Sequence, residues 1–274
     1  LPQFGCFHNC AFVRIHKAYP LQARRVMHAI WGAGQMAWTK FIVVVDDDVN
    51  VHNEEAVLRS MFANCHFGRD IEMVNGPLDI LDHAAPRLGA GCKMGFDATR
   101  QIRGEEVNGI AVSAETRRSS TPTDCSPGAL PPNAHAPQFG GGRCVFVNVE
   151  KRRAGAGAHA IDALWRAAPE GSADFVVALD APGVDLRDWQ RVFFHLCANV
   201  DPGRDLHIEK RGSDPISATG RIAFDATRKL PGDERRGQPV RDYPPIIEMD
   251  AQTNALIDRR WRESSRGGAG ATGR

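Results

Sequence analysis

The sequence predicts an α/β protein made of two tandem copies of a small two-layer or three-layer domain with a mainly parallel sheet. Phe41 to Val45 form an unbroken apolar, mostly β-branched run, which is typical of a strand buried on both faces. The run from Phe175 to Asp180 repeats Phe41 to Asp46, and Phe224 to Arg228 repeats Phe96 to Arg100. Blocks matched in the same order indicate a duplicated unit of roughly 120 residues, an ordinary size for one domain.

These repeats set the expected domain boundaries. The first copy covers residues 1–118, and a second, degenerate copy with a C-terminal helix covers residues 137–262. Residues 119–136 are rich in Ser, Thr, Pro and Ala and form the expected linker. The Ser-Gly-rich residues 263–274 are expected to be a disordered tail. Because the chain starts at Leu1 and not at Met, we expect it to be a piece of a longer protein.

The spacing of apolar residues predicts the first elements of copy one. Cys10 to Ile15 form a short apolar strand. Pro20 is well placed in the first turn of the following helix, and Gly32 offers a C-terminal stop. Apolar residues recur between them at helical spacing and form one stripe, which comprises Ala23, Val26, Met27, Ile30 and Trp31.

The strand from Phe41 to Asp46 is followed by a second predicted helix, with Asn53 as its N-cap. A third strand is expected near Asp70 to Val74, so the order β-α-β-α-β predicts a parallel three-stranded sheet with a helix layer. From Gly76 to Gly95 the pattern is irregular and rich in Gly and Pro, which predicts a loop packed by its own apolar residues. The inward residues of the second helix are Val57, Leu58, Met61 and Phe62.

Copy two repeats this plan with informative differences. Asp188 is the expected cap in place of Asn53, and a last helix is expected to start near Asp250. The interval from Asp205 to Phe224 is shorter than its counterpart in copy one, so copy two has lost the long loop. The apolar residues of its first helix are Ile161, Leu164 and Trp165.

Composition excludes some classes of function. The formal net charge is +1, with 34 Lys and Arg against 33 Asp and Glu, which gives no electrostatic support for a nucleic-acid or anionic-membrane partner. The 7 cysteines form no C-x-x-C pair and are expected to be buried thiols of a cytoplasmic protein. No apolar run approaches the roughly 18 residues of a stable membrane span.

Two interpretations are open for the carboxylates that end the strand at Asp46, Asp47 and Asp48. Clustered carboxylates are hard oxygen ligands, so Asp46 and Asp48 could hold Mg²⁺ or Mn²⁺, as in a metal-dependent glycosyltransferase fragment. Alternatively, one Asp caps the next turn, another forms an ion pair and the third is solvated. We prefer the structural interpretation, because no second cluster of ligands appears in the sequence.

Lys93 is a second candidate binding residue. Glycines on either side of it bring its backbone close to any group that the predicted loop covers. A single lysine there can bind a carboxylate or a phosphate. It can equally pair with Asp97 or with another acid.

Several blocks of copy one together resemble the C-terminal domain of the UbiD-type decarboxylases, which are 3-polyprenyl-4-hydroxybenzoate carboxy-lyase-like enzymes. Copy two resembles the same domain more weakly, through its Phe-Asp-Ala-Thr and Asp-Pro-Gly-Arg-Asp blocks. The matching blocks of copy one are Lys40 to Asn50, Gly68 to Asp70, Pro77 to Asp82, Gly91 to Thr99, and His16 to Pro20 followed by Ala23 to Met27.

The resemblance implies a carboxy-lyase that acts on an aromatic or α,β-unsaturated carboxylic acid, including in ubiquinone or menaquinone biosynthesis. In this family prenylated FMN, a divalent metal and the catalytic residues lie upstream of the matched domain. The resemblance therefore implies that this chain contains no catalytic residue and binds no cofactor on its own. Its expected roles are to close over the protein's own N-terminal flavin-binding region and to support a homo-oligomer.

The resemblance also places the loop from Pro77 to Lys93 against the substrate. An alternative is a non-catalytic assembly module that has lost any enzymatic role. The expected substrate-pocket residues are Leu81, His83, Pro86, Leu88 and Lys93.

Overall fold

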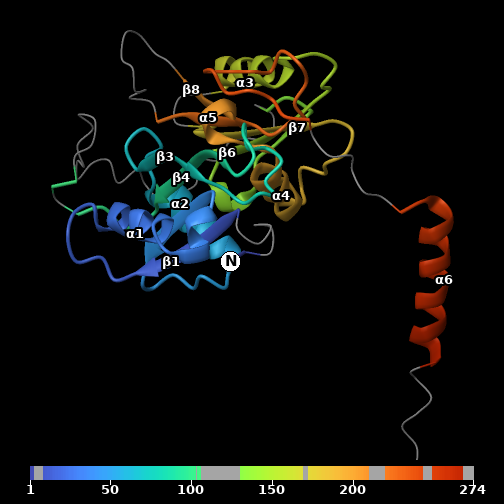
Figure 1. Ribbon diagram of the computed structural model, residues 1–274, viewed down its shortest axis with the longest axis horizontal. Helices are drawn as coiled ribbons and strands as arrows, with labels where there is room; N and C mark the ends of the chain where they lie inside the picture. Colours follow the sequence, from blue (N-terminus) through green and yellow to red (C-terminus); the bar gives the residue numbers. More distant parts are fainter. Residues whose placement is uncertain are drawn as a thin grey trace, which may run out of the picture. The chain divides into compact units, whose positions relative to one another are not determined.

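The computed structural model describes residues 1–2, 9–102, 104–105, 130–168, 172–209, 220–242 and 249–267. The chain divides into two units, Leu1–Asp242 and Tyr243–Arg274. The first unit holds two mixed sheets and their helices, so the predicted α/β class is confirmed (Figure 1). Most of the predicted linker and most of the predicted tail lie outside the described residues.

The sheet of the first half has the order β1-β2-β4-β3. Strands β1 (Cys10–Ile15), β2 (Phe41–Asp46) and β4 (Ala90–Asp97) are parallel, with Cys10 beside Phe41 and Phe41 beside Met94. Strand β3 (Ile71–Pro77) pairs antiparallel with β4 at the edge of the sheet. The predicted central strand β2 is confirmed, and it is buried along its whole length.

Two expectations for this sheet were wrong. The predicted parallel third strand is the antiparallel edge strand β3, and the strand beside β2 is β4, from the stretch that we expected to be a loop. Two glycines in β4 made this strand resemble a loop in the sequence. Both glycines lie where a side chain would not fit. A Cβ on Gly95 would overlap Met27 of the first helix, and a Cβ on Gly91 would overlap Leu78 and Pro86.

The sheet of the second half has the order β5-β6-β7-β9-β8 and repeats the same pairing. Cys144 lies beside Phe175 and Phe175 beside Ile222 in parallel pairs, and β8 runs antiparallel to β9. The short β5 lies at the end of the expected linker. The strands are β5 (Ala134–His135), β6 (Cys144–Val149), β7 (Phe175–Asp180), β8 (Leu206–Ile208) and β9 (Ile222–Asp225).

Each half carries two main helices, and the predicted caps are confirmed. Asn53 Oδ1 accepts a hydrogen bond from the Ala56 N–H at 3.1 Å, and Asp188 Oδ1 accepts one from the Arg191 N–H at 3.0 Å. The helices are α1 (Gln22–Trp31) and α2 (Glu54–Asn64) in the first half, and α3 (Ala156–Ala167) and α4 (Trp189–Asn199) in the second. Shorter elements are the 3-10 helices η2 (Gly34–Trp38) and η5 (Gln138–Gly140) and the one-turn helix α5 (Pro202–Asp205).

Alternation along the strands divides the core into an outer and an inner layer. In β2, Ile42 and Val44 pack against α1, and in β7, Val176 and Ala178 pack with the residues of α3. The opposite faces of both sheets share one core with α2 and α4. Rings from both halves meet there, since the centroid of Phe175 lies 5.4 Å from that of Phe62 and 5.3 Å from that of Phe224.

The second unit contains helix α6 (Ala251–Gly267), whose start confirms the prediction near Asp250. Asp250 caps it by accepting hydrogen bonds from the Thr253 N–H at 2.8 Å and the Thr253 hydroxyl at 3.0 Å. Ile257 and Trp261 are exposed on this helix. None of the helices in the described ranges is long and apolar enough to cross a membrane.

Candidate functional site

A buried lysine lies just beyond β1 in the first half and just beyond β6 in the second. Lys17 Nζ lies 2.6 Å from Glu105 Oε1 and donates a hydrogen bond to Thr99 Oγ1 at 2.8 Å. Lys151 Nζ lies 2.9 Å from Asp233 Oδ2 in the second half. Carboxylates close to a buried ammonium compensate the loss of its hydration, so each cluster is an internally neutralised group.

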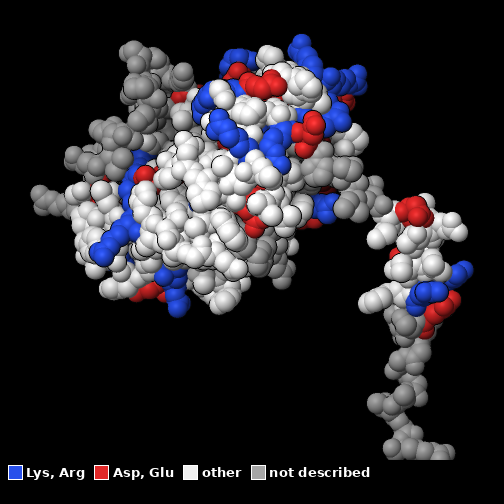
Figure 2. Space-filling view, viewed as in Figure 1, with Lys and Arg blue, Asp and Glu red and all other residues white. Residues whose placement is uncertain are grey.

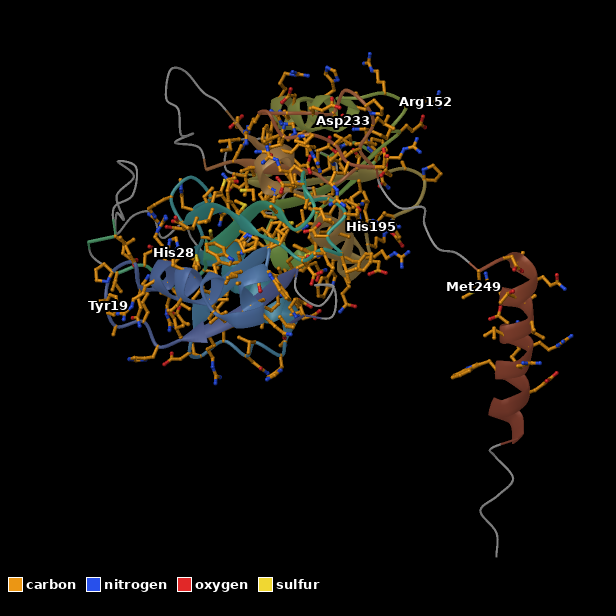
Figure 3. All side chains as sticks on the ribbon, in the orientation of Figure 1. Tyr19, His28, Arg152, His195, Asp233 and Met249 are labelled. Carbon is orange, nitrogen blue, oxygen red and sulfur yellow. The ribbon has the colours of Figure 1, made fainter. Side chains whose placement is uncertain are left out.

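These acids also hold the start of the outer helix in each half. Glu105 Oε1 accepts a hydrogen bond from the Leu21 N–H at 2.9 Å, and Asp233 Oδ1 accepts one from the Gly155 N–H at 2.8 Å. Figure 3 labels Asp233, which is drawn close to α3. Leu21 and Gly155 are the N-cap residues of α1 and α3, and both have a left-handed backbone. The clusters therefore join the carboxyl end of each sheet to a helix.

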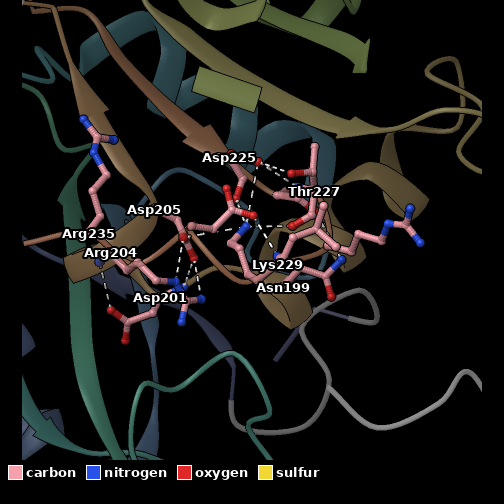
Figure 4. A network of polar contacts seen from close by, with 12 residues as sticks. Asn199, Asp201, Arg204, Asp205, Asp225, Thr227, Lys229 and Arg235 are labelled. Atoms are coloured by element: carbon pink, nitrogen blue, oxygen red, sulfur yellow. Dashed lines mark hydrogen bonds and ion pairs between the residues drawn. The ribbon is translucent and has the colours of Figure 1, made fainter. Parts of the chain in front are cut away.

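In the second half, Lys229 is a further cation in the cluster around Lys151 (Figure 4). Lys229 Nζ donates a hydrogen bond to Thr227 O at 2.7 Å and lies 3.6 Å from Asp205 Oδ1. Burial opposes ionisation of Asp225, but Lys229 and Lys151 outweigh it and hold the pKa of that carboxyl below its usual value. The repeats in the sequence did not identify these lysines as a site. Lys17 and Lys151 nevertheless follow β1 and β6 at the same spacing.

The corresponding carboxylates Asp46 and Asp180 have the same role in the two halves. Asp46 Oδ2 accepts a hydrogen bond from the Arg100 N–H at 2.8 Å, and Asp180 Oδ2 accepts one from the Arg228 N–H at 2.6 Å. The contact is present in both halves, although only the first half has three consecutive carboxylates. It therefore does not depend on a metal site. The structural role of Asp46 stays our prediction, and its contact is the same as that of Asp180.

The other two carboxylates of the first half also have cationic or imidazole partners. Asp48 Oδ2 lies 2.9 Å from Arg100 Nη1, and Asp47 Oδ2 lies 2.7 Å from His16 Nδ1, a contact that lowers the pKa of Asp47. In the described ranges, no group of three His, Cys, Asp or Glu side chains could hold a metal ion. The described partner of both Asp46 and Asp48 is Arg100.

We expect Asp47→Asn to leave metal affinity unchanged and to shift the melting temperature only slightly, because Asp47 lies at the surface and its partner is one exposed histidine. Titration calorimetry with Mn²⁺ is the measurement. Asp46→Asn is the matched comparison, since it weakens the buried acceptor for Arg100 and should lower the melting temperature more. A micromolar Mn²⁺ site abolished by Asp47→Asn would overturn the structural interpretation.

The apolar segment, residues 78–89, is the part of the first half with no described counterpart in the second. It joins β3 to β4, and its ends meet through a hydrogen bond from the Leu78 N–H to Gly89 O at 2.9 Å. Ile80, Leu81 and Leu88 are 69%, 83% and 71% exposed. Large exposed apolar side chains close together in sequence make this segment a candidate contact surface.

The inner side of the apolar segment is buried, and part of it is charged. Lys40 Nζ lies 2.8 Å from Asp82 Oδ2, and both side chains are almost completely buried. Ala84, Ala85 and Pro86 are buried beside them. The segment is therefore fixed to the body of the protein at its middle and presents apolar side chains outward.

The predicted site residues divide between these two sides. Leu81 and Leu88 are on the exposed side, while Pro86 is buried and His83 is half-buried on the inner side. Lys93 lies in the interior strand β4 and not on a loop, which corrects the expected extent of the loop. Burial lowers the pKa of Lys93 to about 8, and its ammonium donates a hydrogen bond to Ala37 O.

A separate cavity of about 660 Å³ opens at the N-terminal ends of α2 and α4. Among the described residues that line it are Glu54 and Glu55, and none is a lysine or an arginine. Acidic side chains repel a phosphate, so this cavity does not fit the phosphate of a flavin mononucleotide.

A family model matches this chain in two ranges. The family model of the 3-octaprenyl-4-hydroxybenzoate carboxy-lyase C-terminal domain matches residues 1–98 and 132–228, which is more than half of the chain. An uncharacterized protein of Archaeoglobus fulgidus is 43% identical over 124 residues, covering 43% of this chain and 26% of that relative.

Two solved structures show local similarity. The UbiD-class enzyme HmfF from Pelotomaculum thermopropionicum, in complex with FMN, is 27% identical with a TM-score of 0.33, covering 41% of this chain and 25% of that one. The closed form of vanillic acid decarboxylase from Sedimentibacter hydroxybenzoicus is 26% identical with a TM-score of 0.34, covering 35% of this chain and 21% of that one. The chain thus spans well under two thirds of the length of each of these relatives. On the family match, the chain belongs to the 3-octaprenyl-4-hydroxybenzoate carboxy-lyase C-terminal domain family.

Proposed function

We propose that this chain is the substrate-closing and assembly region of a prenylated-FMN-dependent carboxy-lyase that acts on an aromatic or α,β-unsaturated carboxylic acid. The observation that carries the proposal is the apolar segment, with Ile80, Leu81 and Leu88 exposed on a fixed backbone. Apolar side chains of this kind suit the unsaturated part of such an acid, or the wall of the pocket that holds it. Membership of the family supports the type of reaction, and a step of ubiquinone or menaquinone synthesis is one candidate.

The proposal assigns cofactor chemistry to the protein's own upstream flavin-binding region. Prenylated FMN, when bound there with its divalent metal, supplies the chemistry that breaks the bond to the carboxylate. The cavity at the N-terminal ends of α2 and α4 does not suit the flavin phosphate, because the acidic side chains among its described lining residues are Glu54 and Glu55 and no lysine or arginine is among them. What this chain contributes is an apolar surface that excludes water from the acid.

A role in assembly belongs to the same proposal. Basic and acidic side chains are interspersed on the face drawn in Figure 2, and the formal net charge is +1. This balance suits contact with further copies in a cytoplasmic homo-oligomer better than contact with nucleic acid. If the full-length enzyme has no carboxy-lyase activity, the non-catalytic assembly role becomes the better description.

Leu88→Ala in the full-length enzyme is expected to change the ratio of kcat/KM for a large and a small acid by about 10-fold, because pocket methylenes control roughly 1–3 kcal/mol of discrimination. The measurement is a competition between the two acids at fixed enzyme concentration, with folding checked by thermal melt. Phe194→Ala is the control, since Phe194 is 38% exposed on α4 in the second half. An unchanged ratio for Leu88→Ala, or an equal shift for Phe194→Ala, would contradict the proposed contact.

A further inference from the structure

We infer that the second half of the chain positions the apolar segment of the first half, so that Asn199, Asp201 and Arg241 are positioning residues. The segment belongs to the first half by sequence, yet the second half makes described polar contacts with His83, Asp82 O and Ala85 O. Lys40 of its own half forms an ion pair with Asp82.

The first contact of the second half is made by the end of α4. Asn199 Oδ1 lies 3.1 Å from Nε2 of His83, which makes the ring nitrogen the donor. The Asn199 amide nitrogen also donates a hydrogen bond to Ala226 O at 3.2 Å, so α4 and the end of β9 hold the asparagine in place. A side chain held at a second point loses little further freedom when it binds the segment.

The next contact is made to strand β4, just after the segment ends. Asp201 Oδ2 accepts a hydrogen bond from the Cys92 N–H at 2.8 Å. This carboxylate occupies the space that a side chain at position 91 would fill, which explains the glycine there. Burial raises the pKa of Asp201, and the Cys92 N–H and Lys40 act in the opposite direction.

A third contact comes from the chain that follows β9. Arg241 Nη1 donates hydrogen bonds to Asp82 O at 3.3 Å and to Ala85 O at 3.5 Å. The backbone leading to Arg241 is itself held, since Arg204 Nη1 donates a hydrogen bond to Pro239 O at 3.0 Å. The middle of the segment therefore lies between Lys40 of the first half and Arg241 of the second.

The corresponding positions of the first half make different described contacts. His66 corresponds to Asp201, because their N–H groups donate in the same way to Asp70 and to Asp205. The His66 ring lies against Gly220, and a Cβ there would come within 2.9 Å of its Cε1. Asn64 corresponds to Asn199 and donates a hydrogen bond to Ala98 O at 3.0 Å, but its described hydrogen bonds all lie within the first half.

The test uses hydrogen exchange of the Leu81, Asp82 and Ala84 amides, which are hydrogen-bonded inside the segment. Asn199→Ala is expected to speed their exchange by about 3- to 10-fold, the effect of losing one hydrogen bond. Asn64→Ala loses the equivalent bond to a strand end and should leave these amides unchanged. Equal exchange of these amides in the two variants would overturn the inference.

A double-mutant cycle makes the test specific to the contact. His83→Ala should speed exchange as Asn199→Ala does, and the double variant should show no further increase, because both changes remove one hydrogen bond. Additive effects of the two changes would show that Asn199 does not act through His83. Arg241→Ala is an independent variant that should speed exchange of the Asp82 and Ala84 amides.

The effect on catalysis rests on the proposed function and is measured separately. In the full-length enzyme, Asn199→Ala should shift the ratio of kcat/KM for a large and a small acid in the same direction as Leu88→Ala, while Asn64→Ala should not. Faster exchange with an unchanged ratio in both Asn199→Ala and Leu88→Ala would support the positioning role and contradict the proposed function. A shifted ratio for Leu88→Ala with unchanged exchange in Asn199→Ala would support the proposed function and contradict the positioning role.

Discussion

Replacing Lys17 by methionine is expected to destabilise the chain by about 3–5 kcal/mol, because the change leaves buried carboxylates without their cation. The Lys17 side chain is 3% exposed, and those of Glu105 and Asp97 are 2% and 5% exposed. Burial already raises the pKa of Asp97 despite the presence of Lys17. The measurement is urea unfolding, in which the midpoint should fall while the slope stays the same.

Three further variants test the cause of this loss. Lys151→Met should also destabilise the chain but at a lower cost, because Lys229 still lies 3.8 Å from Asp225 in the second half. The double variant Lys17→Met with Glu105→Gln should regain part of the stability, since one of the unpaired charges is then removed. Arg59→Met removes an exposed i,i+4 pair with Glu55 and should have little effect. If Lys17→Met were no more harmful than Arg59→Met, the buried cluster would not stabilise the fold.

The second large effect is expected at the centre of the shared core. Phe175 is 1% exposed and contacts rings from both halves, including Phe62, Phe67 and Phe224. Phe175→Ala should lower the free energy of unfolding by about 3–5 kcal/mol, because it leaves a cavity that both sheets line. Since the core is common, this one substitution should destabilise the two halves together.

Two equivalent tryptophans report on the halves separately. Trp31 Nε1 donates a hydrogen bond to Thr39 O at 3.1 Å, and Trp165 Nε1 donates one to Ala173 O at 3.1 Å. Variants in which Trp38, Trp189 and Trp261 are replaced by Phe and only one of these two tryptophans is kept should unfold at the same urea concentration by fluorescence, and Phe175→Ala should lower both midpoints equally. Distinct midpoints, or a shift of the Trp165 signal alone, would mean that the halves fold as independent domains.

Local features were predictable from the sequence because local interactions determine them. The α1 stripe, the Asn53 and Asp188 caps and the buried strand β2 each depend on residues within one or two turns of the chain. Long-range pairing was not predictable in the same way. The edge position of β3 depends on the hairpin that it forms with β4, and the sequence order of the elements suggested a parallel strand instead.

The candidate site could be predicted only in part. The apolar segment was expected from its irregular composition, its leucines are exposed, and its contact with another group stays a prediction. Lys93 was misplaced because glycines in a strand resemble a loop when their neighbours in space are unknown. The contacts of Asn199 and Arg241 with the segment join residues more than a hundred positions apart, and no local pattern encodes them.

The pairing of two similar halves in one chain has an evolutionary consequence. In a symmetric homodimer every substitution appears on both sides of the interface, so a change that improves one contact is imposed on its twin. Here the twin positions are encoded separately, and Asp201 meets Cys92 where His66 meets Gly220. Selection can therefore act on one contact without altering the other. A covalently joined pair can in this way evolve a single asymmetric surface, which a symmetric dimer would have to present twice.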